Sequence, residues 1–145
     1  MISIFLEKFK NEINGIIHVG AHLGQEVEEY LKFNTNKIYL FEPQIEIFNN
    51  LVEKMNKYEN VECFNIGLGS KNHSNTLYKS DGNEGKSSSI LEPSYHLKVQ
   101  PDIQFNEREK ITVQRFDDLG IDTLNFLTID VQGYELEVIK GFGDS

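Results

Sequence analysis

Cysteine is almost absent from this chain of 145 residues, which contains Cys63 alone. A single cysteine argues against an internal disulfide framework and against a cysteine-based zinc cluster. Because Cys63 lies within an apolar strand pattern, we expect a buried thiol that is not a nucleophile. No apolar run is long enough to span a bilayer. The segment Met1–Phe9 lacks a signal-peptide layout, so the predicted location is cytoplasmic.

Basic residues are also few: the chain has 14 Lys and Arg residues against 23 Asp and Glu residues, which gives a net charge of −9. This charge argues against nucleic acid or an anionic membrane as a partner, and its simplest role is solubility. His73 and His96 lie in a polar segment without metal-ligand spacing, so no metal is predicted. The length suits one domain, and the chain shows neither an internal repeat nor a linker.

Apolar runs and helical patterns alternate along most of the chain. This alternation predicts an α/β fold with a mainly parallel sheet and right-handed crossovers. We expect Pro43 in the first turn of a helix, and Gly67–Ser70 as a turn that closes a strand. The predicted helices cover 2–9, a segment that begins at Glu26, a segment from Pro43 to Met55 and a segment around Leu136–Ile139. The predicted strands cover 16–19, 37–41, 61–66 and 124–129.

The polar segment 71–110 interrupts this alternation. Thr76–Tyr78 and Lys110–Arg115 are predicted as short strands that pair antiparallel at a sheet edge. A connection of this length is usually functional or mobile, and the alternative is a simple surface excursion.

The stretch Ile16–Gln25 is the centre of the functional interpretation. It is a short buried strand followed by a turn in which Gly20 and Gly24 remove side chains, so that a cofactor can approach the backbone. About twenty residues later a second strand ends in Glu42, an acid that is well placed for the two hydroxyls of a ribose. The alternative role of Glu42 is to interact favourably with the dipole of the helix that follows.

The turn is not a dinucleotide fingerprint. A first glycine at position 20 requires glycines at 22 and 25, where the chain has His22 and Gln25. A pyrophosphate would therefore be poorly held. A cofactor without phosphate, with its amino-acid end and ribose over the turn, fits better, and S-adenosylmethionine is such a cofactor.

Polar residues after the last predicted strand are expected to share the same crevice. Asp130 ends the strand that should lie on the other side of the first one, and Gln132 and Glu135 follow it. Asp130 is the candidate catalytic residue, as a base or as a group that orients the substrate, and Gln132 and Glu135 are candidate substrate-binding residues. The alternatives are that Asp130 caps a helix and that Glu135 lies on a solvated helix face.

Three further polar residues surround the turn. His18 lies on a buried strand, where a packed and hydrogen-bonded histidine is more common than a base. His22 is predicted to contact the cofactor through its backbone. Asn65 ends the third strand and is predicted to face the adenine edge, with the alternative that it satisfies the strand end.

Five motifs occur in order along the chain, namely His18–Gly24, Phe41–Pro43, Asn65–Gly69, Phe116–Leu119 and Ile129–Glu135. Together they resemble the FkbM family of S-adenosylmethionine-dependent methyltransferases. The resemblance covers about residues 14 to 141 and implies a Rossmann-like class I methyltransferase fold. It also implies methyl transfer, usually to an oxygen of a small molecule or a sugar. By this match Gly20, Ala21 and Gly24 would line the cofactor, and Glu42 would hold its ribose.

The chain departs from the family pattern in three respects. The family often has Asp where this chain has His18, and it usually has Lys and Glu at the positions of Thr128 and Gln132. Family domains continue past Gly141 into further strands, so we expect residues 1–145 to form a single domain that is incomplete at its C-terminus. The sheet edge left open by the missing strands would need a cover, such as a second copy of the chain.

The sequence thus predicts a methyltransferase that acts on a hydroxyl of a small molecule or a sugar. The first alternative is a non-catalytic, truncated cofactor-binding module. The second is a nicotinamide-dependent oxidoreductase, for which two fingerprint glycines are missing.

Overall fold

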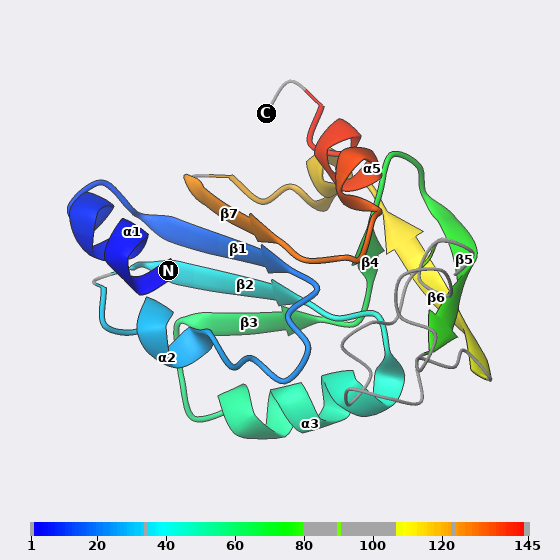
Figure 1. Ribbon diagram of the computed structural model, residues 1–145, viewed down its shortest axis with the longest axis horizontal. Helices are drawn as coiled ribbons and strands as arrows, with labels where there is room; N and C mark the ends of the chain where they lie inside the picture. Colours follow the sequence, from blue (N-terminus) through cyan, green and yellow to red (C-terminus); the bar gives the residue numbers. More distant parts are fainter. Residues whose placement is uncertain (1, 34, 80–89, 91–106, 123, 144–145) are drawn as a thin grey trace.

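Four parallel strands form the centre of the molecule (Figure 1). The computed structural model describes residues 2–33, 35–79, 90, 107–122 and 124–143. The strands are β1 (Gly15–Val19), β2 (Lys37–Phe41), β3 (Val61–Phe64) and β7 (Phe126–Ile129), in the order β3-β2-β1-β7. Val19 pairs with Phe41 on one side and with Ile129 on the other, so these strands end at the same edge of the sheet. The predicted mainly parallel α/β arrangement is confirmed.

The helices lie close to their predicted positions. They are α1 (Ile2–Phe9), α2 (Val27–Tyr30), α3 (Ile45–Met55) and α5 (Glu135–Lys140), with a 3₁₀ helix, η2, at Phe116–Leu119. The prediction for Pro43 is wrong, because α3 begins at Ile45 and its N-cap residue, Gln44, is extended with ψ 116°. Among the described helices, none has both the length and the apolar character needed to cross a membrane.

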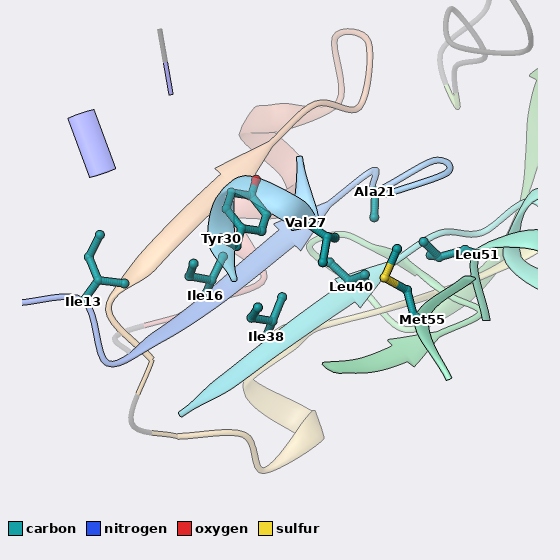
Figure 2. Close-up of a cluster of buried hydrophobic side chains, with 9 residues drawn as sticks. All are labelled: Ile13, Ile16, Ala21, Val27, Tyr30, Ile38, Leu40, Leu51 and Met55. Carbon is teal, nitrogen blue, oxygen red and sulfur yellow. The ribbon is translucent and has the colours of Figure 1, made fainter. Parts of the chain in front are cut away.

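Alternating residues of β1 and β2 supply two hydrophobic clusters, one on each face of the sheet. On one face Ile16, Ile38 and Leu40 are fully buried beneath α2 and α3. Figure 2 shows this cluster, which contains Ile13, Ile16, Ala21, Val27, Tyr30, Ile38, Leu40, Leu51 and Met55. The opposite face packs against η2 and α5 through Ile17, Val19, Phe41, Leu68, Phe116, Tyr134 and Val138. This period-two burial fixes the register of the parallel strands.

A second, three-stranded sheet lies beyond the carboxyl ends of the parallel strands (Figure 1). It contains β4 (Gly67–Leu68), β6 (Glu107–Gln114) and β5 (His73–Lys79), in the order β4-β6-β5. The predicted antiparallel pair is confirmed as β5 and β6. The pair was predicted at a sheet edge, whereas it belongs to this separate second sheet. Gly67 and Leu68 pair with β6 as β4, so they form a strand instead of the predicted closing turn. Residues 80–89 and 91–106 of the polar segment lie outside the described residues.

The outer face of β7 and α5 is partly apolar. Among the described residues, β7 pairs with β1 alone. Leu127 is 39% exposed, and Leu136 and Ile139 of α5 are 63% and 55% exposed. Apolar side chains at a sheet edge are commonly covered by another surface. The expectation that a second copy of the chain covers this edge remains a prediction.

Gly20 allows the turn after β1 to pack tightly against the end of β7. Its φ of 80° lies in the left-handed region, and a Cβ atom there would lie 2.0 Å from the carbonyl oxygen of Asp130. The Asp130 N–H also donates to the carbonyl oxygen of Val19 at 2.9 Å. Space at position 20 is therefore needed by the protein backbone itself, whatever ligand lies above the turn.

We predict that Gly20→Ala destabilises the fold more than Gly120→Ala does. Gly120 also has a positive φ, 66°, but a Cβ atom there meets nothing within 4 Å. Both variants place alanine in the left-handed region, which costs about 1–2 kcal/mol. Only Gly20→Ala also brings a Cβ atom against the Asp130 carbonyl oxygen, and we expect this collision to cost about 1–3 kcal/mol more. Urea unfolding of both variants measures the difference. Equal losses of stability would show that the turn and β7 do not pack in this way.

Candidate functional site

A cavity of about 440 Å³ opens where β1, β2 and β7 end. Six of the predicted site residues line it, namely Gly20, Ala21, His22, Glu42, Asp130 and Gln132. The other described lining residues are His18, Val19, Gln25, Glu26, Phe41, Pro43, Gln44, Ile66, Gly67, Leu68, Leu77, Ile90 and Val131. Because β1 lies between β2 and β7, the cavity occupies the position where parallel α/β sheets bind their ligands.

Glu42 joins two parts of the cavity wall. Its carboxylate is 3% exposed, with Oε2 accepting a hydrogen bond from the His22 N–H and Oε1 accepting one from the Gln44 N–H, both at 2.9 Å. The carboxylate thus holds the turn after β1 and also the start of α3. Each carboxylate oxygen has a second lone pair, so a ligand hydroxyl can still donate to it.

The electrostatic state of Glu42 follows from its burial. Removal from water raises the pKa of the Glu42 carboxyl to about 7, while the two backbone N–H groups and the Gln44 side chain oppose this rise and the charge of Glu109 adds to it. Glu42 therefore changes its charge near neutral pH. A ligand that donates hydrogen bonds to the ionised form would favour that form.

Glu109 of β6 is a second carboxylate at the start of α3. Its Oε1 accepts a hydrogen bond from the Ile45 N–H at 3.0 Å, and its Oε2 forms an ion pair with Lys79 Nζ at 3.1 Å. The contact with Ile45 attaches the second sheet to the helix beside Glu42, and the ion pair joins β5 to β6. The sequence predicted a strand over Lys110–Arg115, whereas the observed strand begins earlier and includes Glu109. No local pattern indicated that Glu109 would contact α3.

Three predicted site residues support the wall from behind instead of lining the cavity. Asn65 donates from Nδ2 to the carbonyl oxygens of Glu42 and Pro43, at 3.0 Å each, as its alternative interpretation implied. Oε1 of Glu135 accepts hydrogen bonds from two backbone N–H groups in the turn after β7, at 3.2 and 3.3 Å. At Gly24 a Cβ atom would lie 2.8 Å from the Met55 side chain, so this glycine makes room for α3.

Asp130 and Gln132 lie together at the rim of the cavity. Asp130 is exposed, and its Oδ1 accepts a hydrogen bond from Gln132 Nε2 at 3.0 Å. Gln132 has a positive φ of 54°, and His22 across the cavity has one of 50°. Among the described residues these are the only two other than glycine with this geometry. Such backbone strain is often found at functional sites.

The described lining combines an apolar wall with negative charge. Ile66, Leu68, Leu77 and Ile90 supply much of the apolar surface, and the last two belong to the polar segment whose role the sequence left open. The acidic residues are Glu26, Glu42 and Asp130, and the described lining contains no lysine or arginine. This cavity suits a ligand with an apolar part and positive charge, and disfavours phosphate groups.

Two residues that the sequence set aside have distinct positions. His18 is buried and its Nδ1 is hydrogen-bonded to the Tyr30 hydroxyl, which confirms the packed histidine, yet His18 also lines the cavity. Cys63 is half-buried, and burial raises the pKa of its thiol to about 11, so the thiol is protonated near neutral pH. A protonated thiol is a poor nucleophile.

Comparisons with known proteins agree with this geometry. The chain is 24% identical over 136 residues to the 2-O-methyltransferase NoeI of Sinorhizobium fredii, with 87% of this chain and 56% of NoeI covered. A crystal structure of methyltransferase FkbM from Methylobacillus flagellatus KT superposes with a TM-score of 0.56 at 17% identity, over 89% of this chain and 28% of that one. The chain thus spans about half the length of NoeI. The incomplete domain expected from the sequence remains a prediction. The family model of the methyltransferase FkbM domain matches residues 18–145, and the chain belongs to this family.

Proposed function

We propose that this chain binds S-adenosylmethionine and transfers its methyl group to a hydroxyl oxygen of a small molecule or a sugar. The observation that carries the proposal is the cavity at the ends of β1, β2 and β7, with its buried Glu42 and its acidic lining. S-adenosylmethionine has a sulfonium and an ammonium group and no phosphate. Its charge therefore complements Glu26, Glu42 and Asp130.

The same lining argues against a nicotinamide dinucleotide. The pyrophosphate of such a cofactor needs backbone N–H groups or basic side chains that face it. Glycines are missing at His22 and Gln25, and the described lining offers no lysine or arginine. Negative charge from three carboxylates would instead repel the phosphates.

Each part of the cofactor has a candidate partner. In the proposal the ribose hydroxyls donate to Glu42, whose oxygens keep free lone pairs beside their backbone contacts. The adenine lies against the apolar wall, where Ile66 and Leu68 are close to the end of β2. The backbone of the Gly20–His22 turn then faces the amino-acid end.

Methyl transfer needs alignment of the acceptor oxygen and removal of its proton. The cofactor supplies an electrophilic methyl group, and the protein holds the acceptor in line with it. Asp130 is exposed at the rim and is oriented by Gln132, so it is the candidate group that binds the hydroxyl and takes its proton. The similarity to NoeI, a 2-O-methyltransferase, supports an oxygen acceptor. The cytoplasmic location remains part of the proposal.

Calorimetric titration with S-adenosylhomocysteine, and with NADH as the control, tests the cofactor class. We expect saturable one-site binding of S-adenosylhomocysteine and no binding of NADH, because the acidic lining complements the first and repels the phosphates of the second. A folded chain that binds NADH alone, or that binds neither ligand, would contradict the proposal.

We predict that Glu42→Gln weakens S-adenosylhomocysteine binding at pH 8 by about 1–3 kcal/mol, the scale of a lost charge-assisted hydrogen bond. For the wild-type protein the affinity should rise as the pH passes upward through about 7, because the Glu42 carboxyl loses its proton in this range. The variant should lack this step in its pH profile.

The matched control is Glu109→Gln, which changes an acid at the start of the same helix but outside the cavity lining. Its affinity at pH 8 should equal that of the wild-type protein. If Glu42→Gln binds S-adenosylhomocysteine as tightly as the control at every pH, Glu42 does not bind the ribose.

A further inference from the structure

A second cavity, of about 500 Å³, opens at the opposite end of the parallel sheet, where β1 and β2 begin. In Figure 1 these strand starts lie on the side away from the second sheet. The described lining residues are Asn14, Asn36, Lys37, Tyr39, Gly120, Ile121, Asp122 and Leu124. None of them lines the first cavity. The volume is within the range of about 300–1,000 Å³ that small-molecule sites have.

Two glycines shape this second cavity. Gly15 has no side chain, and Leu124 occupies the place, because a Cβ atom there would lie 2.2 Å from Leu124 Cδ2. Gly120 turns the chain after η2 with a φ of 66°, and a Cβ atom there would meet nothing within 4 Å. The Asn36 N–H donates to the Asn14 carbonyl oxygen at 2.8 Å, which joins the two strand starts. The backbone thus forms the walls, and no described residue fills the space beside Gly120.

The floor of the second cavity is apolar. It consists of Tyr39, Ile121 and Leu124, which are partly buried against the hydrophobic cluster under η2 and α5. The Tyr39 ring is held from the side by Phe64, with 5.9 Å between the ring centroids. A tyrosine ring beside two aliphatic side chains offers a surface on which a planar apolar group can pack.

Lys37 gives the second cavity a positive charge. It lies two residues before Tyr39 on β2, so both side chains leave the same face of the sheet. Lys37 is exposed, and no described residue forms an ion pair or a hydrogen bond with its ammonium group. Asp122 lies on the wall that follows η2, and its charge disfavours an anion on that side. An anionic group in the cavity is therefore directed toward the start of β2.

We propose that the second cavity binds a small organic anion, whose apolar body lies on the floor and whose single anionic group pairs with Lys37. Asn14 and Asn36 line the same end and have amide N–H groups that can donate to the anion. The first cavity has an acidic lining and disfavours anions, so the two cavities select ligands of opposite charge. The inference does not depend on the proposed function, because the two cavities share no lining residue.

Three small probes separate the parts of this recognition. Benzoate has a planar body and an anion, benzamide has nearly the same shape without the charge, and acetate has the anion without the ring. Nitrogen-15 correlation NMR of the wild-type chain locates each probe by the backbone signals that shift. We expect benzoate to shift the signals of Lys37, Tyr39, Gly120 and Ile121 saturably. Benzamide should bind there about fivefold more weakly, the scale of an exposed ion pair, and acetate should give no saturable shift.

Lys37→Gln removes the cation at an exposed position. Its affinity for benzoate should fall about fivefold, to that for benzamide, while benzamide binding stays unchanged. The matched control is Lys54→Gln, which removes an exposed lysine from α3 on the other face of the sheet. This control should bind benzoate as the wild-type protein does. Added S-adenosylhomocysteine should not change the affinity for benzoate.

Several results would overturn the inference. They are benzoate shifts that do not saturate, shifts centred on Gly20 and Ala21 of the first cavity, and displacement of benzoate by S-adenosylhomocysteine. Equal affinities for benzoate and benzamide, or equal losses in the two lysine variants, would overturn it as well. If S-adenosylhomocysteine fails to bind while benzoate behaves as expected, the proposed function is contradicted and the second cavity stands.

Discussion

The arrangement of the site depends on one buried carboxylate. Glu42 follows β2 directly and accepts hydrogen bonds from the backbone of the β1 turn and from the start of α3. A buried carboxylate is costly unless such donors surround it, and the pKa of about 7 shows that the donors offset only part of the cost. A ligand that donates further hydrogen bonds would stabilise the ionised form. Ligand binding and release of the Glu42 proton are then coupled.

The two sheets contribute different parts of the cavity. The parallel sheet aligns the ends of β1, β2 and β7, which brings Gly20, Glu42 and Asp130 to one edge. The second sheet adds Leu68 and Leu77 to the apolar side. Glu109 attaches that sheet to α3 through the Ile45 N–H, next to the backbone contact of Glu42. The start of α3 thus connects the polar and apolar sides of the cavity.

The sequence predicted the parts of this structure that depend on local patterns. Apolar alternation and helical spacing located β1, β2, α1 and α3 within about two residues. The positions of Glu42 and Asp130 followed from topology, because parallel strands deliver their last residues to the same edge. These predictions needed no knowledge of contacts between distant side chains.

Contacts across large sequence separations were not predictable in the same way. Gly24 and Asn65 are residue types that suit a cofactor site. In the structure, however, Gly24 lies against α3 and Asn65 donates to the loop after β2. Gly67 and Leu68 resembled a turn, but pairing with β6 made them a strand. The sequence around His18 indicated only an apolar strand, whereas the contact of His18 with Tyr30 depends on how α2 packs over the sheet.

The central claim is that Glu42 binds the ribose of a nucleoside cofactor while it holds the β1 turn and α3. A crystal structure of the chain with S-adenosylhomocysteine, grown at pH 8, tests it most directly. The account predicts ribose hydroxyls within hydrogen-bonding distance of the Glu42 oxygens, with the contacts to the His22 and Gln44 N–H groups retained. A nucleoside bound elsewhere, or a ribose that does not contact Glu42, would contradict it.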